Sequence, residues 1–185
     1  MKENNANHYH TQPTVLVTGG AGEIGFAICK KFAENGFSVI ATYHSNATKA
    51  EKLLAALNAM TNQHEPSPNH AIFHAPSTDA QKVNELKAFI ATKYGRLDVL
   101  VNNAGITTPV PHDDLEGLTD EWIDKIMQTN FRGSFAMVRA MKDALSQAAM
   151  LTQKPALVVN ISPMQHWVIW CATHSRRWKP TIQRR

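Results

Sequence analysis

Short apolar runs alternate along the chain with longer segments in which apolar residues recur every three or four positions. The first run, Val15–Val17, is followed by a glycine-rich turn and by a predicted helix that begins near Glu23 and ends near Glu34. The apolar positions of this helix have helical spacing and are Ile24, Ala27, Ile28 and Phe32. The pair Asn35-Gly36 favours the left-handed backbone that ends a helix. The chain therefore opens with a strand, a turn and a helix.

The same order repeats along the rest of the chain. Further strands are predicted at residues 37–42, 71–74, 97–101 and 156–162, and further helices at 46–60, 79–95, 119–129 and 131–149. This alternation is typical of parallel strands that are joined by right-handed crossover helices. We therefore expect an α/β protein with a Rossmann-type doubly wound parallel sheet, in which ligands bind beyond the carboxyl ends of the strands.

The turn Thr18–Gly25 joins the first strand to the first helix at that end of the sheet. The start of a helix offers unpaired N–H groups and a positive dipole end, and glycines let an anion approach the backbone closely. A glycine-rich turn can also be only a turn, but the flanking strand and helix favour a phosphate site.

Small polar residues follow the fourth strand at the expected ligand edge, in the order Asn102, Asn103, Ala104 and Gly105. Asn130 lies at the junction of the two predicted helices 119–129 and 131–149. Taken alone, Asn130 would be interpreted as a cap or turn residue.

The composition is that of one globular domain, with 185 residues of which 43% are hydrophobic. We predict a disordered arm at residues 1–13, a nucleotide-binding domain at 14–162 and an atypical tail at 163–185. The net charge of +4 comes from the tail, because the rest of the chain holds 14 basic and 15 acidic residues. The charge is therefore no argument for a nucleic-acid partner.

Cys29 and Cys171 are too few and too far apart for a disulfide framework, and Cys29 is expected to be a small core residue. His8 and His10 lack further spaced ligands, so we expect no metal site. No apolar run approaches the roughly 20 residues of a membrane span, and the first residues lack a signal-peptide core. The expected compartment is the cytoplasm.

Four motifs together resemble the short-chain dehydrogenase/reductase family over about residues 14–162. They are Thr18-Gly19-x-x-Gly22-x-x-Gly25, Asn102-Asn103-Ala104-Gly105, Asn130 within Thr-Asn-Phe-Arg-Gly, and Val158-Val159-Asn160-Ile161-Ser162. Among subgroups, the chain looks closest to the beta-ketoacyl carrier-protein reductases. The resemblance implies hydride transfer between NAD(P)H and a small carbonyl or alcohol substrate.

The resemblance also implies the roles of site residues. The pyrophosphate would be held by Gly19, Gly22, Ile24 and Gly25, and the adenosine and ribose side by Asn103, Ala104 and Gly105. Asn130 would belong to the catalytic tetrad, where the family's Asn stabilises a helix bend and holds a water in a proton relay. Family members often pair through the long helices, so a homo-oligomer is compatible with the sequence.

Several residues depart from the family pattern. Glu23 stands where the subgroup has Gly, and Pro76 stands where an Asp commonly hydrogen-bonds adenine. Pro163 occupies the position of the catalytic Ser, and none of the three tyrosines has Lys four residues later. The fold is also expected to be incomplete at its C-terminal side. We therefore expect an inactive, truncated relative, the alternative being a nucleotide- or partner-binding module without catalysis.

NAD-binding proteins of this architecture usually end the second strand with an acidic residue that binds the ribose hydroxyls. Here that region holds His44 and Ser45, with Lys49 nearby and no carboxylate. We therefore predict that NADP is preferred over NAD, unless these residues form only a polar loop. From Pro163 onward the sequence is rich in Trp, Arg and His without periodicity, which suggests a shifted reading frame.

Overall fold

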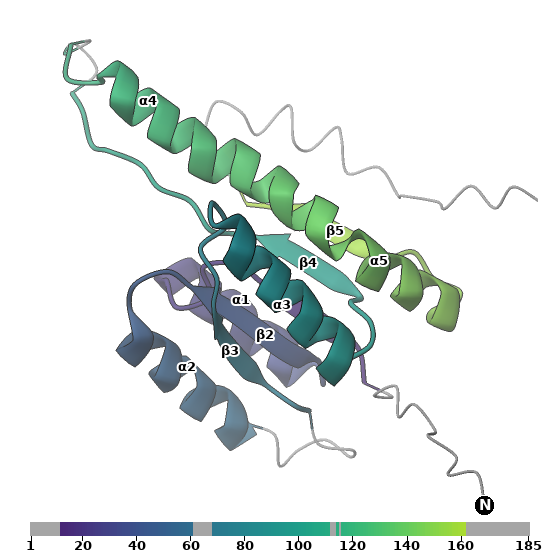
Figure 1. The fold of residues 1–185 in the computed structure, drawn as a ribbon. Coiled ribbons are helices and arrows are strands. Elements are labelled where there is room, and N and C mark those ends of the chain that lie inside the picture. Colours follow the sequence, from purple (N-terminus) through teal and green to yellow (C-terminus); the bar gives the residue numbers. More distant parts are fainter. Residues whose placement is uncertain (1–11, 61–67, 112–113, 115, 162–185) are drawn as a thin grey trace, which may run out of the picture.

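The computed structural model describes residues 12–60, 68–111, 114 and 116–161, and its centre is a five-stranded parallel sheet (Figure 1). The strands are β1 (Thr14–Val17), β2 (Ser38–Tyr43), β3 (Ala71–His74), β4 (Val99–Asn102) and β5 (Leu157–Asn160). Their order across the sheet is β3-β2-β1-β4-β5. The predicted α/β doubly wound sheet is confirmed. The predictions for the arm before residue 12 and for the tail from Pro163 lie outside the described residues.

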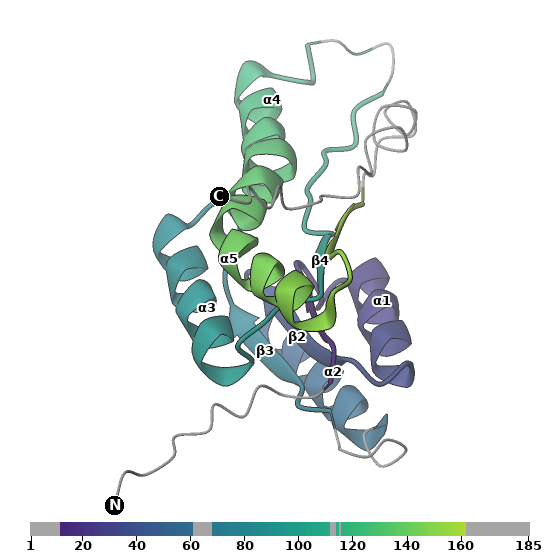
Figure 2. The same ribbon diagram turned by 90° about the vertical axis from the view of Figure 1, so that its right-hand side faces the viewer.

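Helices cover both faces of the sheet (Figure 2). One face carries α1 (Glu23–Glu34) and α2 (Ala47–Met60), and the other carries α3 (Ala80–Lys93) and α5 (Ser134–Thr152). From β1 the sheet grows in one direction through β2 to β3, and the chain then crosses to the other side of β1 to add β4 and β5. The strand order therefore reverses at the β1–β4 pair. A crevice forms at such a reversal, at the carboxyl ends of the two strands.

Alternate residues of the central strands supply two separate cores. Val15, Val17 and Val39 pack with α1 and α2, whereas Leu16, Ile40 and Leu100 pack with α3 and α5. All six side chains are buried. Strands buried on both faces explain why the sequence shows continuous apolar runs instead of alternation.

Helix α1 packs against the sheet through smaller residues than the sequence pattern indicated. Its buried residues are Gly25, Cys29 and Ala33, whereas Ile24 is 63% exposed. The predicted positions Ile28 and Phe32 are partly buried against the same core, so the expected face is only partly confirmed. The fully buried positions are small residues at intervals of four, which let the helix approach the sheet closely. Burial raises the pKa of the Cys29 thiol to about 12, in keeping with the predicted core role.

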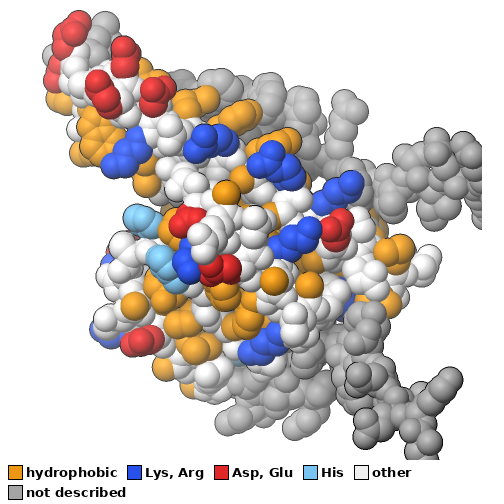
Figure 3. Space-filling view, in the orientation of Figure 1, with side chains coloured by type: hydrophobic (Ala, Val, Ile, Leu, Met, Phe, Trp, Pro, Cys, Tyr) orange, Lys and Arg blue, Asp and Glu red, His pale blue; other side chains and the backbone are white. Residues whose placement is uncertain are grey.

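The two helices expected around Asn130 form one continuous rod. It comprises α4 (Asp120–Ile126), a π-helical segment η2 (Met127–Gly133) and α5, so the predicted break is instead a widened turn. Apolar side chains remain exposed along the rod, and orange patches follow it in Figure 3. They include Ile123, Met127, Phe131 and Phe135. Within the described ranges, no helix has both the length and the hydrophobicity needed to cross a bilayer.

His70, directly before β3, is a buried titratable side chain. Its Nδ1 accepts a hydrogen bond of 3.1 Å from the Val39 N–H, and in the described part of the chain its Nε2 has no partner. Burial lowers the pKa of His70 to about 4, because the charged imidazolium would be desolvated. Protonation of Nδ1 would also remove the acceptor of Val39.

We predict that acidification from pH 6.5 to pH 4 destabilises the fold by up to about 3 kcal/mol through His70. The unfolded chain takes up this proton near pH 6.5 and the folded chain only near pH 4, so the stability contribution falls as the pH falls within that window. Urea unfolding of wild type and His70→Asn at pH 7 and pH 4.5 measures the effect, with the exposed His44→Asn as control. An equal acid loss in wild type and His70→Asn would contradict the prediction.

Candidate functional site

The glycine-rich turn at the end of β1 is fixed to β2 by its backbone. Gly20 N–H donates to the Thr42 carbonyl at 2.9 Å, and Gly19 N–H donates to Thr42 Oγ1 at 3.3 Å. Gly19 has a φ of +65°, in the left-handed region that favours glycine. These contacts hold the turn above the carboxyl ends of the central strands.

Gly25, in the first turn of α1, lies where three segments meet. A Cβ at this position would overlap the Gly19 carbonyl oxygen and lie 2.8 Å from Asn103 Nδ2. A Cβ at Gly22 would meet only the Gly19 carbonyl, at an ordinary 3.4 Å. The glycine at position 25 is therefore required by packing, whereas that at position 22 leaves open space before the helix.

Thr18 and Asn103 join this turn to the loop after β4. Asn103 Nδ2 donates to the carbonyls of Thr18 at 3.0 Å and Gly19 at 3.2 Å. Thr18 Oγ1 accepts from the N–H groups of Asn103 and Ala104, each at 2.9 Å. Sequence reasoning did not assign Thr18 this role, although its place directly before the glycines at a strand end was a usable signal.

The start of α1 presents unpaired N–H groups. The first hydrogen bond of the helix runs from Phe26 N–H to the Gly22 carbonyl at 2.7 Å, so the N–H groups of Glu23, Ile24 and Gly25 lack intrahelical acceptors. Together with the helix dipole, they make this end attractive to an anion. The Glu23 carboxylate lies in the same turn and opposes an anionic ligand.

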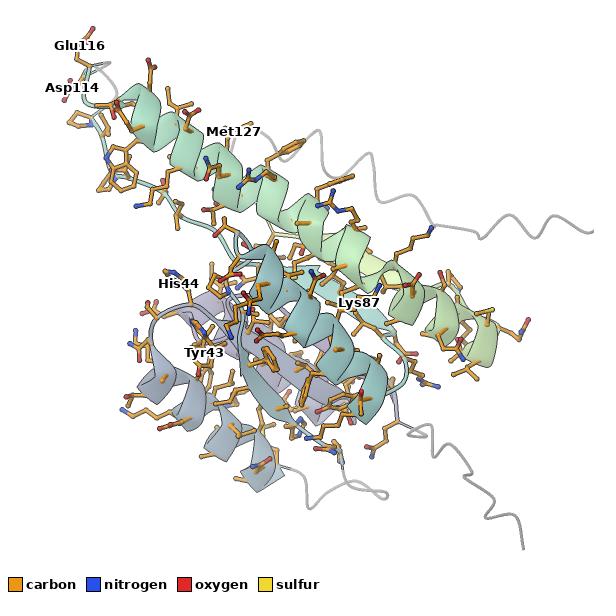
Figure 4. The ribbon with its side chains drawn as sticks, viewed as in Figure 1. Tyr43, His44, Lys87, Asp114, Glu116 and Met127 are labelled. Atoms are coloured by element: carbon orange, nitrogen blue, oxygen red, sulfur yellow. The ribbon has the colours of Figure 1, made fainter. Side chains whose placement is uncertain are left out.

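These elements surround a cleft of about 810 Å³. All ten residues predicted to bind cofactor line it, namely Gly19, Gly22, Glu23, Ile24, Gly25, His44, Ser45, Asn103, Ala104 and Gly105. The lining also contains residues that the sequence did not single out for the site, including Thr42, Tyr43, Ser77, Thr78, Lys125, Gln128 and Thr129. Figure 4 shows Tyr43 and His44 where β2 leads into the loop before α2. Several of the additional residues come from loops whose proximity depends on the tertiary fold.

Asn130 lies beside the cleft, within η2, and holds the loop after β4. Its Oδ1 accepts from the Ile106 N–H at 2.8 Å, and its Nδ2 donates to the Ile106 carbonyl at 2.9 Å. Its own carbonyl accepts from Ser134 Oγ at 2.9 Å, within the widened π turn. Both polar atoms of the Asn130 side-chain amide therefore form hydrogen bonds with the backbone of Ile106.

Neither of the two tyrosines that the structure describes, Tyr43 and Tyr94, forms a hydrogen bond with Asn130. Tyr94 is buried, donates to the Asn69 carbonyl at 3.0 Å and has its pKa raised by burial, which suits a structural residue. Tyr43 lines the cleft at the end of β2, and Pro76 lines it after β3. In the described part of the chain, no group of three or more His, Cys, Asp or Glu side chains could hold a metal ion.

We predict that Gly25→Ala destabilises the protein by about 1 to 3 kcal/mol, because the added methyl group overlaps the Gly19 carbonyl. Gly22→Ala is the matched control and should cost less than about 1 kcal/mol, since its methyl group makes only an ordinary contact. Urea unfolding of both variants measures the difference. Equal stabilities would show that the turn and helix do not meet as closely as described.

We predict that Asn130→Asp destabilises the protein by about 1 to 3 kcal/mol at pH 7, because a carboxylate cannot donate to the Ile106 carbonyl. The loss in unfolding free energy should shrink at pH 4, where protonation of the introduced carboxylate restores a donor. Asn84→Asp, at an exposed position of α3, is the control and should change stability little at either pH. Urea unfolding at the two pH values measures both variants, and a loss of the same size at each pH would contradict the hydrogen-bond role.

Comparisons with known proteins agree with this geometry. The family model described as short chain dehydrogenase matches residues 13–171. The short-chain dehydrogenase/reductase FrzI of Cladobotryum sp is 32% identical over 151 residues, covering 80% of this chain and 52% of that protein. The 3-oxoacyl-[acyl-carrier-protein] reductase FabG of Staphylococcus aureus is 30% identical, covering 80% of this chain and 55% of its own length.

Solved structures give the same result. A short-chain dehydrogenase/reductase from Burkholderia xenovorans superposes with a TM-score of 0.72 at 26% identity, over 82% of this chain and 60% of that one. A short chain dehydrogenase from Burkholderia cenocepacia in complex with NADP gives a TM-score of 0.61 at 32% identity, over 71% of this chain and 50% of that one. The chain spans about half the length of the curated relatives it matches. On this evidence the chain belongs to the short-chain dehydrogenase family.

Proposed function

We propose that residues 14–162 form the nucleotide-binding domain of an NAD(P)-dependent oxidoreductase. The observation that carries the proposal is the cleft at the β1–β4 reversal, with the glycine turn and the open start of α1 on its wall. The family reaction is hydride transfer between NAD(P)H and a small carbonyl or alcohol substrate. The cytoplasm is its expected compartment.

The residues that line the cleft support binding of a dinucleotide. The absence of Cβ atoms at Gly19 and Gly22, with the N–H groups of Glu23 and Ile24 beside them, suits the pyrophosphate. Asn103, Ala104 and Gly105 line the neighbouring wall, which suits the adenosine and ribose side. When bound, the nicotinamide supplies the hydride chemistry.

The residues after β2 support the proposed preference for NADP over NAD. His44, Ser45 and Lys49 line the cleft there, and α2 begins at Ala47 with its positive dipole end nearby. Asn46 Oδ1 accepts from the Lys49 N–H at 2.9 Å and so caps that helix. Glu23 is the one acidic residue among the lining residues that the structure describes. The 2′-phosphate of NADP would therefore meet donors and no carboxylate at this edge.

The chain holds the residues proposed to bind the cofactor but lacks the pair of residues that the family uses for proton transfer. Asn130 fixes the loop at Ile106 next to Gly105, so it is suited to shape the cleft wall beside the reaction centre. The sequence contains no Tyr-x-x-x-Lys, the pair that would donate and accept the proton at the substrate oxygen in the family. We propose that the chain binds cofactor but has little or no reductase activity. The alternative function, a binding module without catalysis, makes the same cofactor prediction and differs in requiring a saturable partner.

A second copy of the chain is the proposed partner for the exposed apolar stripe Ile123, Met127, Phe131 and Phe135. Phe131 and Phe135 are each 63% exposed on the continuous rod of α4, η2 and α5. Burying such side chains against each other would remove a large apolar area from water.

We predict that NADP binds at least about tenfold more tightly than NAD, a difference of about 1.4 kcal/mol. His44→Asp should reverse this order, because a carboxylate accepts hydrogen bonds from the ribose hydroxyls and repels the 2′-phosphate. Fluorescence or calorimetric titration of both nucleotides measures the ratio. Thr92→Asp, an exposed change near the C-terminal end of α3, is the control for charge alone. Tighter binding of NAD to the wild type would refute the preference, and binding of neither nucleotide would refute the proposed function.

A further inference from the structure

The side chain of His74, the last residue of β3, makes a hydrogen bond to β2 one residue beyond the end of the backbone ladder between the two strands. The backbone ladder continues as far as Ala75 N–H, which donates to the Tyr43 carbonyl at 3.1 Å. The next carbonyl of β2 belongs to His44, and His74 Nε2 lies 2.7 Å from its oxygen. Because a carbonyl oxygen only accepts, Nε2 must carry the proton in this hydrogen bond.

The imidazole of His74 is oriented by its neighbour across the two strands. Tyr43 and His74 are register partners, and their ring centroids lie 5.4 Å apart at an angle of 50°. The His74 side chain is otherwise exposed on β3, which is an edge strand of the sheet. The ring contact and the hydrogen bond together define one position for the imidazole.

The segment that His74 contacts carries the residues proposed to meet the 2′-phosphate. Before it, the Thr42 carbonyl is bound by Gly20 N–H, and after it, Asn46 caps α2 through Lys49 N–H. Between these two anchors, His44 and Ser45 are exposed and belong to no regular element. The bond from His74 to the His44 carbonyl therefore provides an anchor in the middle of the segment.

We propose that His74 is a positioning residue for recognition of the 2′-phosphate, an inference that rests on the proposed NADP preference. His74 is not among the residues lining the cleft, whereas His44 and Ser45 are, so His74 acts through the backbone of His44. A fixed backbone holds both side chains where a phosphate can use them, and less conformational freedom is lost on binding. NAD lacks the 2′-phosphate and gains little from this arrangement.

His74→Phe and His74→Gln test the inference as a matched pair in the full chain. Phe keeps an aromatic ring beside Tyr43 but cannot donate, whereas the Gln amide restores a donor. We expect His74→Phe to weaken binding of NADP and of adenosine 2′,5′-bisphosphate about fivefold or more, with less than a twofold change for NAD and 5′-AMP. His74→Gln should recover most of the loss, because its amide restores a donor toward the His44 carbonyl.

The outcomes separate this inference from the proposed function. A wild type that does not prefer NADP refutes the proposed preference itself. A wild type that prefers NADP, combined with unchanged ratios in His74→Phe, overturns the role of His74. An equal loss for all four nucleotides in both His74 variants also overturns it, because that pattern indicates a general structural effect. Loss confined to the two 2′-phosphorylated nucleotides, with recovery in His74→Gln, supports it.

Discussion

The close approach of the start of α1 to the turn after β1 is the constraint on which the site depends. Gly25 touches the Gly19 carbonyl and the Asn103 amide at once, so a side chain at this position would separate the helix, the turn and the β4 loop. Thr18 closes the same junction from the other side with its hydroxyl. The cleft is thus a consequence of tight packing, because the missing Cβ atoms that allow the contacts also leave the backbone accessible to an anion.

The opposite wall is built in a similar way from a local irregularity. Asn130 lies within the π-helical segment η2, and its side chain makes two hydrogen bonds with the backbone of Ile106. Asn102 supports the same region, because its Nδ2 donates to Asn160 Oδ1 at 2.9 Å and joins the ends of β4 and β5. Widened turns of this kind are frequent at functional sites, and here the hydrogen bonds show what the irregularity does.

Most of the architecture could be predicted from local pattern. Strand β3 lies at the predicted residues, and the other strands differ from the prediction by one or two residues at their ends. Leu97 is an example: it is buried, as an apolar strand residue would be, but it precedes the first paired residue of β4. For α1 the pattern was right only in part, because the close packing buries the small residues Gly25, Cys29 and Ala33 fully and the larger apolar residues Ile28 and Phe32 only partly. It also could not show that the helices around Asn130 form one rod, since a π turn has no distinct periodicity in a short segment. The glycine turn and the Asn-Asn-Ala-Gly loop were located because their motifs are contiguous, and their roles toward a cofactor stay predictions.

The contacts that sequence reasoning missed connect residues far apart along the chain. Thr18 and Asn103 are 85 positions apart, and His74 and His44 are 30 positions apart. Neither pair has a spacing that indicates a contact, because the register of parallel strands is set by the whole sheet. The residues that touch a ligand can therefore be proposed from motifs, while the residues that hold them in place emerge only from the fold. For His44 this distinction matters chemically, since its side chain is exposed toward a ligand while its backbone carbonyl accepts a hydrogen bond from His74.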